Sequence, residues 1–246
     1  MALFTDGPAF TMEELAAHET AILDTASAEG IDLTRKIELA REQVGLELES
    51  VLLRHGSCSV GLKNVVVTAP LRLWHVFHTL AVVYRDAYFN QLNDRYKAKW
   101  TEYQDLAKWA SRMLQGIGVG TVADPIAQAD IADIGEAPGA LPAGTYFVKV
   151  AWRNASGEEG APSALASIDT SDGNVVRARP SSFPSNGVSW AVYAGTTPED
   201  LFLQAEGLSP ATFWTVPDSG LLTARRAGNG QEPTLMRPMP RVLPRG

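Results

Sequence analysis

The 246-residue chain has 21 Lys and Arg against 28 Asp and Glu, a formal net charge of -7, and a hydrophobic share of 45%. This mild acidity argues against a general nucleic-acid-binding surface, because phosphate binding draws its affinity from clustered basic side chains. No apolar run reaches the roughly 20 residues of a spanning helix and no signal-peptide pattern opens the chain, so we expect cytoplasmic synthesis and no membrane partner. The single Cys, Cys58, excludes an internal disulfide and leaves zinc sites without their usual thiolates.

The N-terminal third predicts two helices. Thr11 and Glu14 make a capping-box pattern, which favours a helix from about 11 to 28 that Gly30 ends. A second helix is expected from Asp32, a suitable N-cap, to about Arg54. Its apolar residues recur at steps of three and four and so share one face: Leu33, Ile37, Ala40, Val44, Leu48 and Val51. Residues 57–68 then predict a loop that contains a short extended piece.

Residues 71–115 form the longest helical pattern and contain neither Gly nor Pro. Large side chains first repeat at alternating steps of three and four, which predicts a seam that requires a partner helix: Leu71, Trp74, His78, Ala81, Arg85, Tyr88 and Leu92. The phase slips by one residue near 90–94 before a second seam continues: Tyr96, Trp100, Tyr103, Ala107, Ala110 and Leu114. The stretch is therefore either two helices with a tight joint or one long helix with a local irregularity.

Residues 116–140 interrupt the helical pattern and are rich in Gly, Ala, Asp and Pro, which predicts a linker. Its Gly-Ile-Gly-Val-Gly string at 116–120 follows a helix, whereas a dinucleotide-binding loop must follow a strand. A phosphate-binding function is therefore not expected.

From residue 141 the hydrophobic period changes from 3.6 to 2. Residues 145–153 alternate as a half-buried strand does. Further short strands are expected at 164–168, 174–178, 188–194, 201–205 and 212–216, each bounded by turn residues. Short strands at this spacing predict an antiparallel β-sandwich over 141–224.

The C-terminal residues 225–246 contain five Arg, one acidic residue and four Pro. Such a composition favours an extended chain. The segment is either a disordered tail or a basic arm that docks on a neighbouring acidic surface, and Arg237 and Arg241 are candidate interface residues. The expected organisation is thus a helical domain at 1–115, a linker at 116–140, a sandwich at 141–224 and this arm, in an α + β fold with separate domains.

Two segments of the predicted sandwich carry a resemblance. LPAGTYFVKVAWRNASGEEGAPSALASI is similar to the last two strands of a fibronectin type III or Ig-like module, and GVSWAVYAGTTPEDLFLQAEGLSPATFWTVPDSGL resembles its middle strands. The order is permuted, since the last-strand pattern comes first. The resemblance implies an Ig-like sandwich of the kind common on phage structural proteins.

The helical part also resembles a known family. IDLTRKIELAREQVGLELESVL and the later WHVFHTLAVVYRD and NDRYKAKWTEY strings are similar to head-to-tail connector (neck adaptor) proteins of tailed phages. That resemblance implies a structural virion protein in a ring between portal and tail. Its partners would be further copies of itself, the portal protein, and tail, tail-terminator or neck proteins, with no specific nucleic acid apart from DNA in the channel.

No residue pattern indicates catalysis, a cofactor or a metal. His75 and His78 lie three residues apart but have no carboxylate in the pattern to complete a metal site. We therefore expect no enzymatic activity. Aromatic side chains are enriched at buried contacts, so five aromatics of the long helical stretch are interface candidates: Trp74, Tyr88, Tyr96, Trp100 and Tyr103. An alternative function is a virion-anchored binding module whose sandwich recognises a host-surface glycan; Trp190 and Trp214 would then be exposed.

Overall fold

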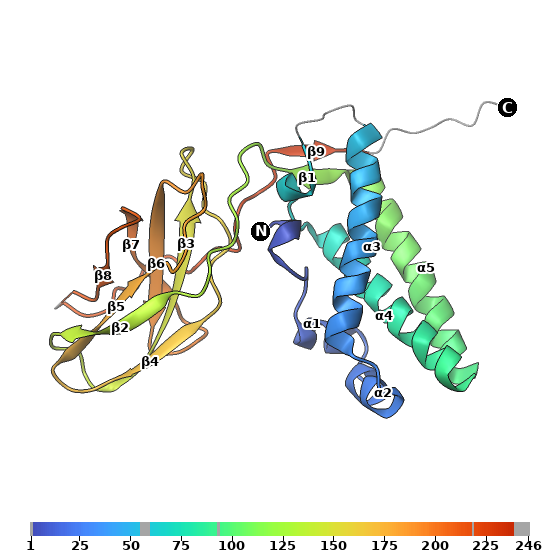
Figure 1. Cartoon of the computed structure of the whole chain (residues 1–246), viewed down its shortest axis with the longest axis horizontal. Coiled ribbons are helices and arrows are strands. Elements are labelled where there is room, and N and C mark those ends of the chain that lie inside the picture. The colour runs from blue at the N-terminus through green and yellow to red at the C-terminus, as the bar shows by residue number, and fades with distance from the viewer. Residues whose placement is uncertain (1, 55–59, 93, 218, 239–246) are drawn as a thin grey trace. The chain divides into compact units, whose positions relative to one another are not determined.

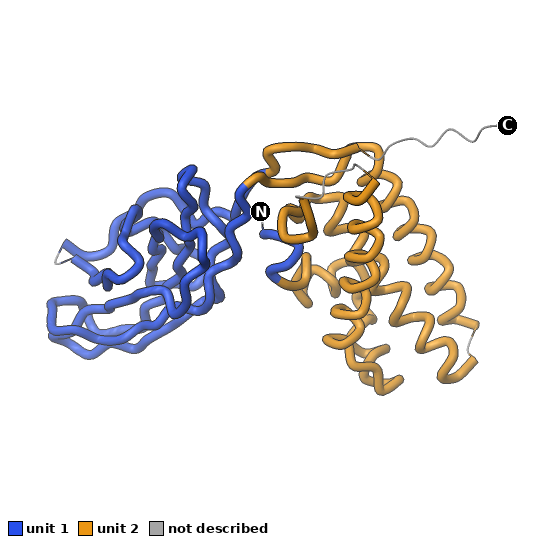
Figure 2. Tube along the Cα trace, turned by 45° about the horizontal axis from the view of Figure 1, so that its top comes forward, with its two compact units in different colours: residues 1–6, 124–232 blue, residues 7–123, 233–246 orange. Residues whose placement is uncertain are grey.

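The computed structural model describes residues 2–54, 60–92, 94–217 and 219–238. The chain divides into two compact units, coloured separately in Figure 2. Residues 7–123 and 233–246 belong to a helical unit, and residues 1–6 and 124–232 belong to a β-unit. The predicted fold class is confirmed, because helices come first and antiparallel sheets follow in a separate region with sandwich-like packing.

The described part of the helical unit has five α-helices, labelled in Figure 1. They are α1 (Met12–His18), α2 (Ile22–Glu29), α3 (Leu33–Arg54), α4 (Ala69–Gln91) and α5 (Asp94–Ile117). Two short 3-10 turns accompany them, η1 (Phe4–Asp6) in the β-unit and η2 (Leu62–Asn64) before α4. Among the residues described, none of these helices is long and apolar enough to cross a membrane.

The predicted helix over 11–28 is instead two helices. Thr11 caps α1 through the expected capping box with Glu14. The chain then leaves the helical conformation at Glu19, whose side chain is buried and accepts a hydrogen bond from the hydroxyl of Tyr103 at 2.7 Å. A buried carboxylate requires such donors, so this contact with α5 competes with a continuous helix. Gly30 ends α2 in the left-handed conformation, with φ 63°.

Helix α3 agrees with its prediction in bounds and in its buried face. The side chain of Asp32 accepts a hydrogen bond from the backbone N–H of Arg35 at 3.0 Å, as an N-cap does. The six apolar positions that the sequence placed on one face are all buried: Leu33, Ile37, Ala40, Val44, Leu48 and Val51.

The long helical stretch is two helices, which decides between the alternatives left by its phase slip. Leu92 ends α4 with φ 52°, and its N–H donates to the carbonyl of Tyr88. Asp94 then opens α5, while Asn93 lies outside the described residues. The joint lets α5 fold back along α4, and these two helices form the most extensive packing in the unit. Helix α3 packs on α4 as well but scarcely meets α5 in the described part of the chain.

The predicted linker and the predicted arm both contain strands. Strand β1 (Val119–Thr121) pairs antiparallel with β9 (Leu235–Arg237), and both belong to the helical unit. Strand β2 (Asp133–Pro138) belongs to the β-unit, which therefore begins at residue 124 and not at 141. Three-residue strands whose partners lie far away in the sequence leave no periodic signal, which is why a composition rich in Gly and Pro suggested a linker.

The β-unit holds two antiparallel sheets of three and four strands. One has the order β2-β5-β8 and the other has the order β4-β3-β6-β7. The remaining strands are β3 (Gly144–Arg153), β4 (Ala166–Thr170), β5 (Asn174–Arg179), β6 (Ser189–Gly195), β7 (Phe202–Leu208) and β8 (Trp214–Thr215). Every predicted strand overlaps one of these. The core between the sheets includes Trp152, Trp190 and Trp214, all of them buried.

Candidate functional site

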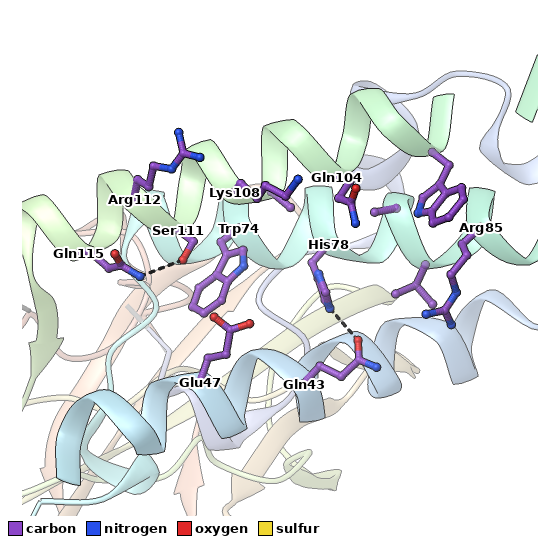
Figure 3. Close-up of a pocket in the computed structure, with 14 residues that line it drawn as sticks. Gln43, Glu47, Trp74, His78, Arg85, Gln104, Lys108, Ser111, Arg112 and Gln115 are labelled. Carbon is purple, nitrogen blue, oxygen red and sulfur yellow. Dashed lines mark hydrogen bonds between the residues drawn. The ribbon is translucent and has the colours of Figure 1, made fainter. Parts of the chain in front are cut away.

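A groove runs along the helical unit between α3 and α5, with α4 as its floor. It has a volume of about 530 Å³, and Figure 3 shows side chains of all three helices converging on it. Its floor is made by Trp74, His78, Ala81, Val82 and Arg85 of α4. Four of these five residues belong to the seam that the sequence analysis expected to require a partner helix. The neighbouring helices already cover much of this floor, since Trp74 and Ala81 are 5% and 6% exposed and His78 and Arg85 are half-buried.

The two walls of the groove differ in charge. The α5 wall is basic along the exposed edge, where Lys108 and Arg112 lie one turn apart. The α3 wall presents Gln43 and Glu47, and Glu47 points toward the Trp74 indole in Figure 3. The groove partly removes Glu47 from water, and this burial raises the pKa of its carboxyl group.

A second hollow of about 390 Å³ continues the groove toward the C-terminal ends of α3 and α5. It shares Glu47, Trp74, Ser111 and Gln115 with the first, so the two form one channel that is divided by Trp74. The Trp74 side chain is only 5% exposed and presents one edge to this channel. The floor combines the apolar Trp74, Ala81 and Val82 with His78 and Arg85, and a groove of mixed character between two helices can accept an amphipathic helix.

His78 connects the floor to the α3 wall. Its Nε2 lies 2.6 Å from Oε1 of Gln43, to which it donates a hydrogen bond. Burial, together with the nearby charge of Arg85, holds the pKa of His78 below its usual value. His78 is therefore neutral at physiological pH and fixes the spacing between α3 and α4. It does not supply a charge to the groove.

Tyr88 and Trp100, two of the predicted interface residues, stack at one end of the groove. Their ring centroids are 6.0 Å apart, and Phe89 lies against both rings. Both are half-buried, whereas Phe89 is 60% exposed. The cluster offers an aromatic surface whose inner part is packed on the α4–α5 joint.

Tyr96 and Tyr103, also predicted interface residues, are buried inside the unit. Tyr96 donates to Glu29 at 2.9 Å, and Tyr103 donates to Glu19. Burial raises the pKa of Tyr103, and the adjacent Glu19 carboxylate raises it further. Burial acts to raise the pKa of Glu19 as well, but hydrogen bonds from Lys99 and Tyr103 outweigh it and hold that pKa below its usual value. These tyrosines fix α1 and α2 to α5 and are not available to a partner.

The basic C-terminal residues are divided between the units. Arg225 pairs with Glu159 at 2.8 Å in the β-unit, and Arg226 forms an ion pair with Asp200. Arg237 lies in β9, where its backbone pairs with Val119 of the helical unit. Arg241 and Cys58 lie outside the described residues.

Two exposed apolar ridges on the helical unit escaped the sequence analysis. The first, the α3 ridge, consists of Leu39, Leu46 and Leu53, which repeat every seventh residue; Leu46 is 67% exposed and Leu53 is 74% exposed, whereas Leu39 is half-buried. The second, the α5 ridge, consists of Trp109, Met113 and Ile117. The seven-residue spacing of the α3 ridge was a readable signal, but the stronger pattern on the buried face of the same helix obscured it.

The described residues contain no group of three or more His, Cys, Asp or Glu side chains that can hold a metal ion. His75 is fully buried: its Nδ1 accepts from the N–H of Ala9 at 3.3 Å, and its Nε2 donates to the carbonyl of Ile37 at 3.1 Å. Both ring nitrogens are thus used in fixing the N-terminal segment and α3 to α4. The spacing of His75 and His78 has a structural explanation in each case.

A scan against protein-family models, a search of curated proteins and a search of solved structures each found no match.

Proposed function

We propose that this chain is a head-to-tail connector of a tailed phage, a structural virion protein that assembles as a ring between portal and tail. The observation that carries the proposal is the open groove over the α4 seam. A three-helix layer with an open groove along one face can accept a further helix from another molecule. The sequence resemblance of residues 31–115 to neck adaptor proteins suggests that this assembly is a ring between portal and tail.

The exposed apolar side chains support an assembling role. Isolated surface leucines are ordinary, but the α3 ridge and the α5 ridge each place several large apolar side chains in a row. Apolar rows on two different helices suit a ring, because each subunit of a ring uses two different surfaces to meet its two neighbours.

The β-unit supports the appended Ig-like module of the proposal. Its strands β3 and β4 are neighbours in one sheet, β6 pairs on the other side of β3, and β5 lies in the second sheet. The same arrangement of neighbouring strands is expected for a fibronectin type III sandwich whose last two strands come first in the chain. In the connector the module would be displayed outward from the ring.

The alternative, recognition of a host-surface glycan by the sandwich, has less support. Trp190 is fully buried and Trp214 is 6% exposed, so neither can serve as a platform for a sugar ring. Phe213 is exposed, but the guanidinium groups of Arg177 and Arg179 lie 5.2 and 4.5 Å from its ring centroid and cover it.

Negative-stain imaging of the full chain, alone and mixed with the portal protein encoded in the same viral genome, tests the proposal. We expect an added ring of density on the portal that is absent from the portal imaged alone. A chain that stays monomeric and leaves the portal unchanged would contradict the connector role. Binding of the full chain to a glycan array, with no change in the portal, would favour the alternative.

A further inference from the structure

We infer that the groove between α3 and α5 receives the α3 ridge of a second copy of this chain. The inference rests on the proposed connector role and specifies the subunit contact of that assembly. It follows from three properties of the two surfaces: their apolar spacing, their charge and the way they are placed on the unit.

The apolar spacing of the two surfaces matches. Residues of the α4 floor recur at alternating steps of three and four, and the leucines of the α3 ridge recur every seven residues. Helices whose contacts repeat every seven residues pack side by side, with each large side chain seated between residues of the facing helix. The small side chains of Ala81 on the floor and Ala107 on the α5 wall line the groove beside larger residues such as Trp74.

The charges of the two surfaces are opposite. Glu42 and Glu49 flank the α3 ridge along one side, and both are exposed; Glu42 also forms an exposed ion pair with Arg35 at 3.8 Å. The α5 wall of the groove carries Lys108 and Arg112. Arg112 makes no hydrogen bond or ion pair with any other residue that the structure describes, so its charge is available to an incoming carboxylate. Complementary charge of this kind fixes the register of two helices and rejects wrong partners.

The placement of the two surfaces makes the contact directional. Leu46 of the ridge also lines the second hollow, so the ridge borders the groove on the outer side of α3. A subunit can give this outer side of α3 to one neighbour while its groove receives the ridge of the other. Such a heterologous contact closes into a ring when the rotation between subunits allows it. The α5 ridge fits the groove less well, because Arg112 lies beside it and carries the same sign of charge as the wall it would meet.

Charge reversal on each surface tests the inference. One full-length variant carries Glu42→Lys and Glu49→Lys, and the other carries Lys108→Glu and Arg112→Glu. All four side chains are exposed, so folding is preserved and is checked by circular dichroism. We expect each variant alone to sediment as a monomer at concentrations at which the unaltered chain associates. An equimolar mixture should associate again, because every contact in it can join opposite charges.

Apolar variants separate the two ridges. Leu46→Asp with Leu53→Asp should abolish self-association, and Leu23→Asp, on the exposed surface of α2, is the matched control that should not. An unaltered chain that is monomeric at every concentration overturns the inference, as do reversed variants that still associate alone. Loss of association in Trp109→Asp with no loss in the α3 variants would assign the groove to the α5 ridge instead.

The portal experiment distinguishes this inference from the connector role. If the charge-reversed variants bind the portal as the unaltered chain does and also self-associate, the subunit contact is wrong and the connector role stands. If groove variants lose the portal and keep self-association, a portal helix occupies the groove and the inference fails. If the unaltered chain forms the predicted contact but ignores the portal, the connector role fails alone.

Discussion

Lowering the pH from about 7 to about 5 should destabilise the helical unit through His75. Burial lowers the pKa of this imidazole from 6.5 to about 4, and the hydrogen bond to the carbonyl of Ile37 and the charge of Glu38 offset only part of this effect. Between those two pKa values His75 is protonated in the unfolded chain but neutral in the folded unit. Its contribution to the free energy of unfolding is therefore fully present above about pH 6.5 and decreases as the pH falls toward 4. At about pH 5 the loss amounts to about 2 kcal/mol relative to pH 7.

Urea unfolding followed by far-ultraviolet circular dichroism measures this loss in the helical unit, because all five described α-helices belong to that unit. His75→Gln removes the titrating ring, so its free energy of unfolding should change by about 2 kcal/mol less between the two pH values than that of the unaltered chain. His18→Gln is the control, since His18 is exposed. Equal pH dependence in the unaltered chain and in the His75 variant would refute the reasoning.

Three further substitutions test other contacts. Trp100→Ala should lower the free energy of unfolding by about 1 to 2 kcal/mol through the lost stacking on Tyr88 and should weaken self-association; an unchanged melting temperature with full assembly would contradict this. Glu19→Gln should cost about 2 kcal/mol, because Tyr103 loses a charged acceptor inside the unit, and thermal unfolding with a Tyr103→Phe double-mutant cycle measures the coupling. Gly118→Ala should loosen β9, since φ is +109° there and an added Cβ would lie 2.9 Å from the β9 backbone; unchanged hydrogen exchange in β9 would count against it.

The sequence predicted the elements whose signals are local. The face of α3 and the six sandwich strands follow from short-range periodicity, from caps and from turn residues. The phase slip near residues 90–94 marked an irregularity but left one helix or two open. Strands β1 and β9 lie more than a hundred residues apart and are three residues long, so only the folded chain brings them together. The break at Glu19 depends in the same way on Tyr103, which no local pattern connects to it.

The sequence predicted the α4 seam that forms most of the groove floor, but it wrongly placed Tyr96 and Tyr103 at an interface. The α4 seam was expected to require a partner helix, and the structure makes most of it the floor of a groove. Tyr96 and Tyr103 are not at the surface, because the half-buried Glu29 of α2 and the buried Glu19 beside α1 hold their hydroxyl groups inside the unit. Aromatic content alone cannot distinguish a ring that meets a partner from a ring that completes a hydrogen-bonded core.

The pairing of β1 with β9 imposes an order on biosynthesis. Strand β1 is translated before any part of the β-sandwich, while its partner at Leu235–Arg237 is translated after all of it. During synthesis the edge of β1 that later pairs with β9 therefore stays unpaired until the intervening residues have left the ribosome and folded as a separate unit. The helical unit gains its last strand only when the sandwich is already complete, so a chain truncated within the sandwich can never finish the helical unit either.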